Sequence, residues 1–336
     1  MKAVGTLALF LLCACGTNVG PEVELTGNTM GTQFSVKLAA GDAVSDAIWL
    51  EKDIKAALAD VEQMMSTYLP GSETSRFNSS TSTDWQGVSE EFCLSVEEAL
   101  AISTLTGGSF DITVGPLVNL WGFGPGDIID EPPADEDIST MLESVGYEHL
   151  QADCAQPALK KDIAELTLDM SAIGKGYATD RVAAILNESD IENYLVEIGG
   201  ELRLRGHNAD NAKWAIGIEA PLPNQRRPHT ILRLSDTAMA TSGDYRNYFE
   251  AGGTRYSHTI DTRTGWPVTH SLASVTVVDE DGYRADALAT ALLVMGPDAG
   301  MELATRESMA VLFLLRTESG IEELSTPAFE QLRSTT

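Results

Sequence analysis

The sequence has few positively charged residues. It contains 22 Lys and Arg against 50 Asp and Glu in 336 residues, which gives a formal net charge of −28. A protein that binds nucleic acid needs a basic surface to neutralise phosphates, so this balance excludes nucleic acid as a partner. We interpret the excess of acidic residues as a solvated surface. An anionic ligand would enter against this field, so its site is expected to contain local cations or a metal ion.

Long hydrophobic runs are also missing. Lys2 is followed by an apolar run over residues 3–14, which is too short for a permanent transmembrane helix. The run ends in Leu-Cys-Ala-Cys-Gly (12–16), which resembles a lipobox, so Cys15 is expected to be lipidated and to become the mature N-terminus. An ordinary signal peptide or a membrane-buried start is the alternative. The predicted parts are a lipoprotein signal peptide (1–14), a lipidated tether (15–22) and one domain (23–336).

Cysteine is scarce as well. The sequence has four, and Cys93 and Cys154 alone would keep a thiol once Cys13 is removed and Cys15 is lipidated. In an oxidising compartment these two residues can form a disulfide, but their spacing does not show that they are close. Two separate buried thiols are an equal alternative. Neither residue has the spacing of a metal site.

Two common nucleotide-binding motifs are absent: there is no Gly-x-Gly-x-x-Gly after a predicted strand and no P-loop. Clustered strands with a few inserted helices predict an α+β fold rather than a doubly wound sheet. The acidic, Pro-containing stretch 126–137 is interpreted as a loop. Apolar residues at helical spacing predict helices through 54–65, 92–100, 172–186 and 284–294. Strands are predicted over 32–38, 166–168, 194–198, 202–204, 214–218, 231–234, 274–278 and 310–315.

Several segments are rich in Gly, Asp, Thr and His rather than in core residues. Residues 168–180 run from a predicted strand into a helix and contain Lys175, so they offer backbone amides and one cation to a phosphate group. Asp286 and Thr290 share one face of an otherwise apolar helix, where oxygen ligands would suit Mg²⁺ or Ca²⁺. Glycines around Trp121 indicate backbone close to a flat ligand. The simpler alternatives are a capped helix start, a capping Asp with a back-bonded Thr, and a Gly-rich loop over the core.

Five longer matches follow one another in order between Met30 and Gly296. They are Gly-Pro-Leu-Val-Asn-Leu-Trp-Gly-Phe-Gly (115–124), Asp-Met-Ser-Ala-Ile-Gly-Lys-Gly-Tyr (169–177), Thr-Ser-Gly-Asp-Tyr-Arg (241–246), Ser-His-Thr-Ile-Asp (257–261) with Arg-Thr-Gly (263–265), and Ala-Asp-Ala-Leu-Ala-Thr (285–290). In this order they resemble the FAD:protein FMN transferase (ApbE) family, and they cover most of the mature chain.

The resemblance implies a single-domain, T-fold-like α+β architecture with a mostly antiparallel sheet and inserted helices. It also implies an enzyme that binds FAD and Mg²⁺, transfers FMN to a Thr or Ser hydroxyl in a short motif of a partner protein, and releases AMP. Acceptors in the family include subunits of the Na⁺-translocating NADH:quinone reductase and of Rnf complexes. Many members are lipoproteins that face the periplasm. We therefore expect this chain on the periplasmic side of the inner membrane, where such acceptors lie.

The resemblance also implies site residues, position by position. Mg²⁺ is expected to bind the backbone carbonyl of Ala172 and the side chains of Asp286 and Thr290. His258 is the candidate general base for the acceptor hydroxyl, with Asp261 as the residue that orients it. The residues expected to line the FAD site are Met30, Tyr68, Ser109, Phe110, Asp111, Asp169, Lys175 and His258.

Two other functions are consistent with the same motifs. The first is an FAD pyrophosphatase, in which water replaces the acceptor hydroxyl and the products are FMN and AMP. The second is a flavin-binding lipoprotein without turnover, which would have no need of Asp286, Thr290 and Lys175 to stabilise a leaving group. Gly174 stands where Ala is frequent in the family and Thr262 where Pro is usual, but neither change removes a ligand.

Overall fold

The computed structural model describes residues 22–39, 47–126, 128–222, 227–245 and 247–334. Among these residues, no helix has both the length and the apolar composition needed to cross a membrane. The predicted signal peptide (1–14), Cys15 and the tether up to residue 21 lie outside the described residues, so lipidation stays a prediction.

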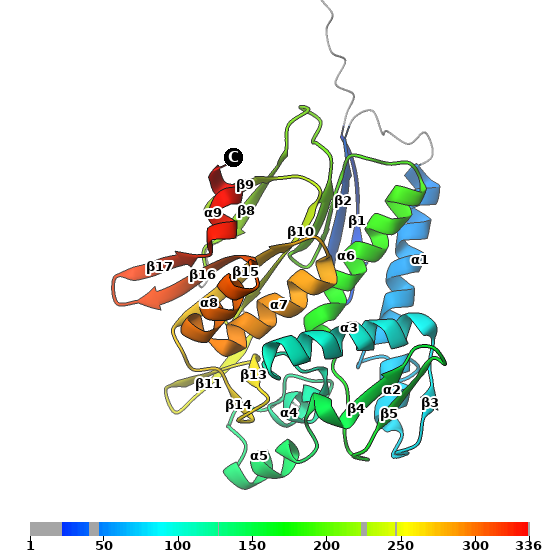
Figure 1. Ribbon diagram of the computed structural model, residues 1–336, viewed down its shortest axis with the longest axis vertical. Helices are drawn as coiled ribbons and strands as arrows, with labels where there is room; N and C mark the ends of the chain where they lie inside the picture. The colour runs from blue at the N-terminus through cyan, green and yellow to red at the C-terminus, as the bar shows by residue number, and fades with distance from the viewer. Residues whose placement is uncertain (1–21, 40–46, 127, 223–226, 246, 335–336) are drawn as a thin grey trace, which may run out of the picture.

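An eight-stranded sheet forms the centre of the molecule, and every neighbouring pair of strands in it is antiparallel (Figure 1). In order across the sheet, its strands are β1 (Val23–Thr29), β2 (Thr32–Leu38), β6 (Tyr194–Ile198), β7 (Glu201–Arg205), β10 (Thr237–Gly243), β15 (Leu272–Asp279), β16 (Ala310–Thr317) and β17 (Gly320–Ser325). The predicted α+β class with a mostly antiparallel sheet is confirmed. The bounds of β2 and β6 match the predicted ranges.

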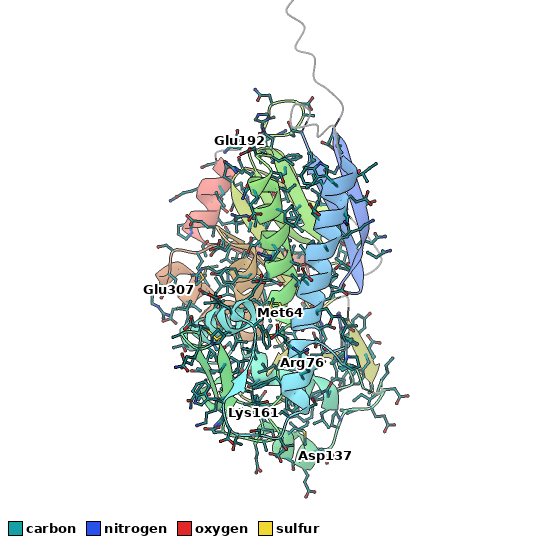
Figure 2. All side chains as sticks on the ribbon, turned by 90° about the vertical axis from the view of Figure 1, so that its right-hand side faces the viewer. Met64, Arg76, Asp137, Lys161, Glu192 and Glu307 are labelled. Atoms are coloured by element: carbon teal, nitrogen blue, oxygen red, sulfur yellow. A yellow bond between two sulfur atoms is a disulfide. The ribbon has the colours of Figure 1, made fainter. Side chains whose placement is uncertain are left out.

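Helices cover one face of this sheet and bury the larger apolar cluster (Figure 1). They are α1 (Ala47–Met65), α6 (Ser171–Glu188) and α7 (Gly282–Met295), with α3 (Glu90–Thr106) lying across them. Helices α1 and α6 run side by side, as Figure 2 shows. Helices α6 and α7 approach closely because glycines lie at their contact: a Cβ added to Gly176 would be 2.1 Å from the carbonyl oxygen of Gly282.

A separate hairpin covers the other face of the sheet together with the last helix. The hairpin consists of β8 (Trp214–Glu219) and β9 (Pro228–Leu234), and the helix is α9 (Pro327–Ser334). Side chains of β16 alternate between the two faces: Phe313 packs toward the helices, whereas Leu312 and Leu314 pack toward the hairpin. Burial on both faces explains why this strand reads as an unbroken apolar run.

An aromatic cluster holds together several short helices and strands outside the central sheet. Trp121, which is fully buried, stacks on Tyr256 at 5.5 Å and meets Trp266 edge-on at 5.3 Å between ring centroids. The indole N–H of Trp121 donates a hydrogen bond of 2.8 Å to the carbonyl of Gly265. The cluster joins α4 (Gly115–Leu120), α5 (Asp135–Leu142), β11 (Tyr248–Ala251), β12 (Thr254–Ser257), β13 (Ile260–Asp261) and β14 (Trp266–Pro267). Helix α5 begins inside the stretch 126–137 that was predicted as a loop, so that loop is shorter than expected.

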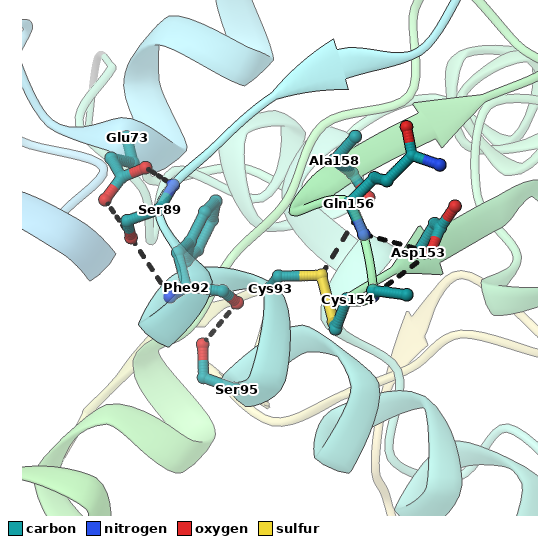
Figure 3. The surroundings of a disulfide bond; sticks show 10 residues. Glu73, Ser89, Phe92, Cys93, Ser95, Asp153, Cys154, Gln156 and Ala158 are labelled. Atoms are coloured by element: carbon teal, nitrogen blue, oxygen red, sulfur yellow. Dashed lines mark hydrogen bonds between the residues drawn. A yellow bond between two sulfur atoms is a disulfide. The ribbon is translucent and has the colours of Figure 1, made fainter.

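Cys93 and Cys154 form a disulfide, which decides between the alternatives that the sequence left open (Figure 3). Cys93 lies in α3, and Cys154 lies in the turn between β4 (Leu150–Asp153) and β5 (Ala158–Lys161). The carboxylate of Asp153 accepts hydrogen bonds from two backbone N–H groups of this turn. The bridge therefore ties α3 to the small sheet of β3 (Gln86–Gly87), β5 and β4.

The strand predicted over 166–168 is wrong. Leu166 and Leu168 are fully buried, as an apolar run requires, but within the described residues no strand pairs with them. Side chains take the place of a neighbouring strand: Asn78 donates to and accepts from the backbone of Leu168, and the ammonium of buried Lys161 donates to the carbonyl of Leu166. The remaining elements are α2 (Glu73–Ser79), η1 (Ile112–Val114), η2 (Tyr147–His149) and α8 (Pro297–Arg306).

Candidate active site

A cavity of about 570 Å³ lies between the first turn of α6, helix α7, the end of β10 and the segment that follows β12. Nine of the predicted site residues line it, although they come from segments far apart in the sequence. Met30, Tyr68 and Asp261 are the predicted site residues that lie outside its lining. Those that line it are Ser109, Phe110, Asp111, Asp169, Ala172, Lys175, His258, Asp286 and Thr290.

Helix α6 presents its first turn to the cavity, as the motif around Lys175 predicted. Asp169 fixes the approach to this helix: its backbone N–H donates to the carbonyl of Ile112 at 2.7 Å, and its carboxylate accepts from the N–H of Ser171 at 2.8 Å. The carboxylate thereby satisfies one of the backbone donors that every helix start leaves unpaired. Ala172 and Lys175 then follow at the cavity wall.

Lys175 is the cation that this turn brings into the cavity. Its ammonium lies 2.9 Å from the carboxylate of Glu201 and 3.7 Å from that of Asp286. Burial favours the neutral amine, but the two carboxylates outweigh it and raise the pKa of Lys175, so the side chain is charged at neutral pH. Burial also raises the pKa of the Glu201 carboxyl, against the attraction of Lys175. The hairpin turn Gly199–Gly200, between β6 and β7, brings Glu201 to this position.

Asp286 and Thr290, which were predicted to bind Mg²⁺ together with Ala172, lie one turn apart on α7. Asp286 is 2% exposed, and its Oδ2 accepts a hydrogen bond of 2.9 Å from the backbone N–H of Gly176. It lies within α7 rather than at its start, which excludes the alternative of a capping Asp. The hydroxyl of Thr290 is 2.9 Å from that of Ser242.

The donors of these three residues fit a hard divalent cation. One carboxylate, one hydroxyl and one backbone carbonyl are all oxygen ligands, and Mg²⁺ commonly binds proteins through one or two carboxylates and completes its shell with substrate phosphates and water. No cluster of three His, Cys, Asp or Glu occurs in the part of the chain that the structure describes. A cation in this cavity would therefore rely on the mixed set of Ala172, Asp286 and Thr290.

His258 directly follows β12, and its ring meets that of Phe123 edge-on at 6.2 Å between centroids. The Nδ1 atom is 3.0 Å from the backbone carbonyl of Asn247, which can only accept a hydrogen bond. Nδ1 therefore holds the proton of the neutral ring, and Nε2 keeps the lone pair that a general base needs. Burial, together with the nearby charge of Lys175, lowers the pKa of His258, so the ring is neutral at pH 7.

The prediction that Asp261 orients His258 is wrong. The carboxylate of Asp261 instead binds Arg263, with two hydrogen bonds of 2.8 Å to the guanidinium. Its backbone carbonyl accepts from the N–H of Gly265 at 2.8 Å and closes the turn between β13 and β14. Asp261 therefore shapes the turn beside His258, and the carbonyl of Asn247 is the acceptor that orients the imidazole.

The turn after α3 forms another wall of the cavity. The helix ends at a glycine in the left-handed conformation (φ 59°), which redirects the chain into residues 109–111. The buried hydroxyl of Ser109 has no hydrogen-bond partner among the described residues, so a ligand atom could satisfy it. Asp111 differs, because its oxygens accept from Thr113 and from the backbone N–H of Tyr147. Burial raises the pKa of Asp111 against these bonds, and the carboxylate holds the loop together.

Met30 and Tyr68 lie beside the cavity rather than in its wall. Met30 is at the tip of the β1–β2 hairpin, and its terminal methyl carbon would be 3.3 Å from a Cβ added to Gly174. Tyr68 follows α1 and is 65% exposed, and its hydroxyl donates at 3.5 Å to the carbonyl of Phe123. For FAD to contact both residues, it would have to extend beyond the cavity.

Three residues around the site were not predicted as parts of it. Glu201 directly follows the Gly199–Gly200 turn and pairs with Lys175, 26 residues away in the sequence. Asn247 acts through its backbone carbonyl, which leaves no signature in a sequence. Glu62 hydrogen-bonds to the tip of the β1–β2 hairpin but is one of many acidic residues on an amphipathic helix. Arg246, the last residue of one matching motif, lies outside the described residues.

The charged residues of the cavity are mostly acidic. Lys175 is the only Lys or Arg among the lining residues that the structure describes. A diphosphate entering the cavity would be repelled by this lining unless a cation accompanied it, which agrees with the expectation drawn from the net charge of the chain. The acidic lining residues are Asp111, Asp169, Glu197, Glu201, Glu219 and Asp286.

Comparison with known proteins agrees with this geometry. The model of the ApbE family matches residues 30–313. The sequence is 44% identical over 331 residues to the FAD:protein FMN transferase of Vibrio cholerae, with 98% of each chain covered. It is 39% identical over 340 residues to that of Haemophilus influenzae, covering 100% of this chain and 98% of the other. The solved structure of the flavin transferase ApbE from Vibrio cholerae has a TM-score of 0.86 and 43% identity, covering 93% of this chain and 99% of that one.

Proposed function

The chain belongs to the ApbE family and transfers flavin from FAD to proteins, and we propose that it joins FMN to a Thr or Ser hydroxyl, releases AMP and requires Mg²⁺. One observation carries this proposal. A neutral histidine, a charged lysine and a set of oxygen donors that suits a cation line a single cavity. Phosphoryl transfer to a hydroxyl needs these groups, because catalysis of this reaction consists mainly of positioning and electrostatic stabilisation.

In the proposed reaction, the acceptor hydroxyl attacks the phosphorus on the flavin side of the FAD diphosphate. Nε2 of His258 takes the hydroxyl proton as the new bond between oxygen and phosphorus forms. The bond from this phosphorus to the bridging oxygen breaks, and AMP leaves with the electron pair of that bond. FMN thereby becomes attached to the acceptor oxygen through its phosphate.

Lys175 and Ser109 would hold the diphosphate. The Lys175 ammonium has three donors, so it can bind a phosphate oxygen while it keeps its hydrogen bond to Glu201. The unpartnered hydroxyl of Ser109 can donate a further hydrogen bond. Asp286, Thr290 and the carbonyl of Ala172 would hold Mg²⁺, which when bound neutralises the diphosphate and stabilises the departing phosphate.

We also propose the location and the acceptors of the enzyme. Lipidation of Cys15 would anchor it to the periplasmic side of the inner membrane. The acceptors would be periplasmic segments with a Thr or Ser motif, as in subunits of the Na⁺-translocating NADH:quinone reductase or of Rnf complexes. The support is the short apolar run that ends at Cys15, together with the family to which the chain belongs.

Mass spectrometry of a candidate acceptor domain tests the function. The domain is incubated with the full chain in detergent, FAD and Mg²⁺, and a gain of one FMN on a Thr or Ser is expected. EDTA or Asp286→Ala should abolish this gain. Asp298→Ala removes an exposed carboxylate from the first turn of α8 and serves as the matched control. Free FMN and AMP beside an unmodified acceptor would identify a pyrophosphatase. FAD that stays intact would show that the chain only binds flavin and does not turn it over.

A further inference from the structure

The β1–β2 hairpin closes with an unfavourable residue. Its two-residue turn is Met30–Gly31, with φ angles of 49° and 70°, between the paired residues Thr29 and Thr32. Two-residue turns with both φ angles positive favour Asn-Gly or Asp-Gly, because most other side chains are disfavoured in the left-handed conformation. Formation of the turn alone therefore does not account for Met at its first position.

The side chain of Met30 packs behind the cavity wall. A Cβ added to Gly174 would lie 3.3 Å from the terminal carbon of Met30 and 3.6 Å from the sulfur of Met65. Gly174 directly precedes Lys175 in the first turn of α6, which faces the cavity. Met30 therefore fills the space between the end of α1 and the turn that presents Lys175.

The residue after the turn packs against the same wall. A Cβ added to Gly199 would lie 2.9 Å from the methyl carbon of Thr32 and 3.2 Å from Cδ of Lys175. Gly199 lines the cavity at the turn between β6 and β7. The hairpin tip consequently packs beside Gly199, and the aliphatic stem of Lys175 lies next to the same glycine.

Glu62, on α1, holds this tip in place. Its Oε1 accepts hydrogen bonds from the backbone N–H of Met30 and, at 3.0 Å, from the hydroxyl of Thr29. Hydrogen bonds to a carboxylate are about twice as strong as bonds between neutral groups. No Lys, Arg or His in the described part of the chain pairs with Glu62, so its carboxylate serves the hairpin tip.

We propose that Glu62 is a positioning residue for the FAD site. By holding Met30 in its left-handed conformation, it keeps the hairpin tip against α6 and so sets where Lys175 meets FAD. Glu62 does not line the cavity and acts through Met30. This inference rests on the proposed function, in which Lys175 binds the diphosphate of FAD.

Glu62→Ala tests the proposal through FAD binding and steady-state transfer. The Kd for FAD is expected to rise about tenfold, because the variant lacks the hydrogen bond to a charged group that holds Met30 in its unfavourable conformation. The KM for FAD should rise in parallel, while kcat at saturating FAD changes less than about twofold, because His258 and the cation ligands are untouched. Glu62→Gln retains an acceptor oxygen and should stay within about threefold of wild type.

Asp60→Ala is the matched control, because Asp60 is an exposed carboxylate on the same helix. The hydrogen bonds to the hairpin tip come from Glu62 and not from Asp60. Wild-type FAD affinity is expected for this variant. If Glu62→Ala fails to fold, Glu62→Asp gives the same test, since it keeps the charge but withdraws the carboxylate by one methylene. A Kd like that of wild type in either Glu62→Ala or Glu62→Asp would overturn the inference.

A double-mutant cycle tests whether Glu62 acts through Met30. Glycine adopts a positive φ without penalty, so in a Met30→Gly background Glu62→Ala should change the Kd by less than about twofold. An equal change in both backgrounds would show that Glu62 acts elsewhere. Failure of the wild-type chain to bind FAD would contradict the FAD site itself, whereas binding that is insensitive to Glu62 contradicts the positioning role alone.

Discussion

The close contact between α6 and α7 leads to a specific prediction about Gly176→Ala. The added Cβ would lie 2.1 Å from the carbonyl oxygen of Gly282 and 2.8 Å from Cβ of Asp286. Neither neighbour is the flexible end of a side chain, so the two helices must separate by roughly 1 Å to relieve the overlap. The hydrogen bond from the Gly176 N–H to the Asp286 carboxylate must lengthen with this separation.

Two terms set the size of the effect. Overpacking of a buried contact costs about 1–3 kcal/mol, and a weakened hydrogen bond to a charged group costs up to about 3 kcal/mol. We therefore expect a loss of about 1–6 kcal/mol in the free energy of unfolding, which lowers the Tm by roughly 2–15 °C. A displacement of about 1 Å at Asp286 should also reduce the transfer rate on the order of 100-fold.

Gly174→Ala is the matched control for this substitution. It lies two residues earlier in the same turn, but its Cβ would meet flexible ends: the Met30 methyl carbon at 3.3 Å and the Met65 sulfur at 3.6 Å. Alanine is also favoured over glycine within a helix by about 0.5–1 kcal/mol, so stability should be kept or rise slightly. Urea unfolding and initial transfer rates compare the variants. Equal stability and activity of Gly176→Ala and Gly174→Ala would refute the argument that the glycine contact positions Asp286.

Three further predictions concern the base and the disulfide. His258→Ala should lower the transfer rate about 10²–10⁴-fold at saturating FAD with little change in the Kd for FAD, and an unchanged rate would show that His258 is not the base. Burial lowers the pKa of His258, and the base must be neutral to accept a proton. The transfer rate should therefore persist at pH 6.5 and fall only as the pH drops through the lowered pKa of His258. A rate that is already half-maximal above pH 6.5 would contradict this. Replacing both Cys93 and Cys154 by Ser should lower the free energy of unfolding by about 4 kcal/mol, as expected for a sequence separation of 61 residues. Urea unfolding measures this loss, and equal stability of the oxidised wild type and the double variant would exclude the disulfide as a stabilising link.

The buried elements could be predicted from the sequence because burial leaves a pattern. Strand β16 reads as an apolar run, and helices α1, α3, α6 and α7 repeat apolar residues at helical spacing. Strand β17 was not predicted, since its residues alternate between half-buried and exposed positions at the sheet edge. The apolar run 166–168 predicts a strand, but side chains rather than a second strand satisfy its backbone. These side chains, Asn78 and Lys161, lie elsewhere in the sequence, so no local pattern reveals them.

Most of the candidate site could be predicted because its residues lie in Gly-rich motifs with several polar side chains. The relation between residues within one motif was less predictable. Asp261 is three residues from His258 in the sequence, yet its carboxylate faces Arg263, and a backbone carbonyl orients the imidazole. Glu62 is 32 residues from Met30, and no local pattern connects them. Such contacts depend on how α1 and the β1–β2 hairpin pack in three dimensions.

The acidity of the whole chain and the composition of the cavity pose one electrostatic problem. Lys175 is charged, but its charge is already shared with Glu201 and Asp286, and the remaining charged lining residues that the structure describes are acidic. A single ammonium cannot offset a diphosphate in such surroundings, because burial strengthens the repulsion between like charges. The oxygen donors on α6 and α7 could hold a divalent cation. Such a cation would reverse the local charge at the point where the diphosphate enters. On the proposed function, the close glycine packing of the two helices would therefore serve binding as well as stability.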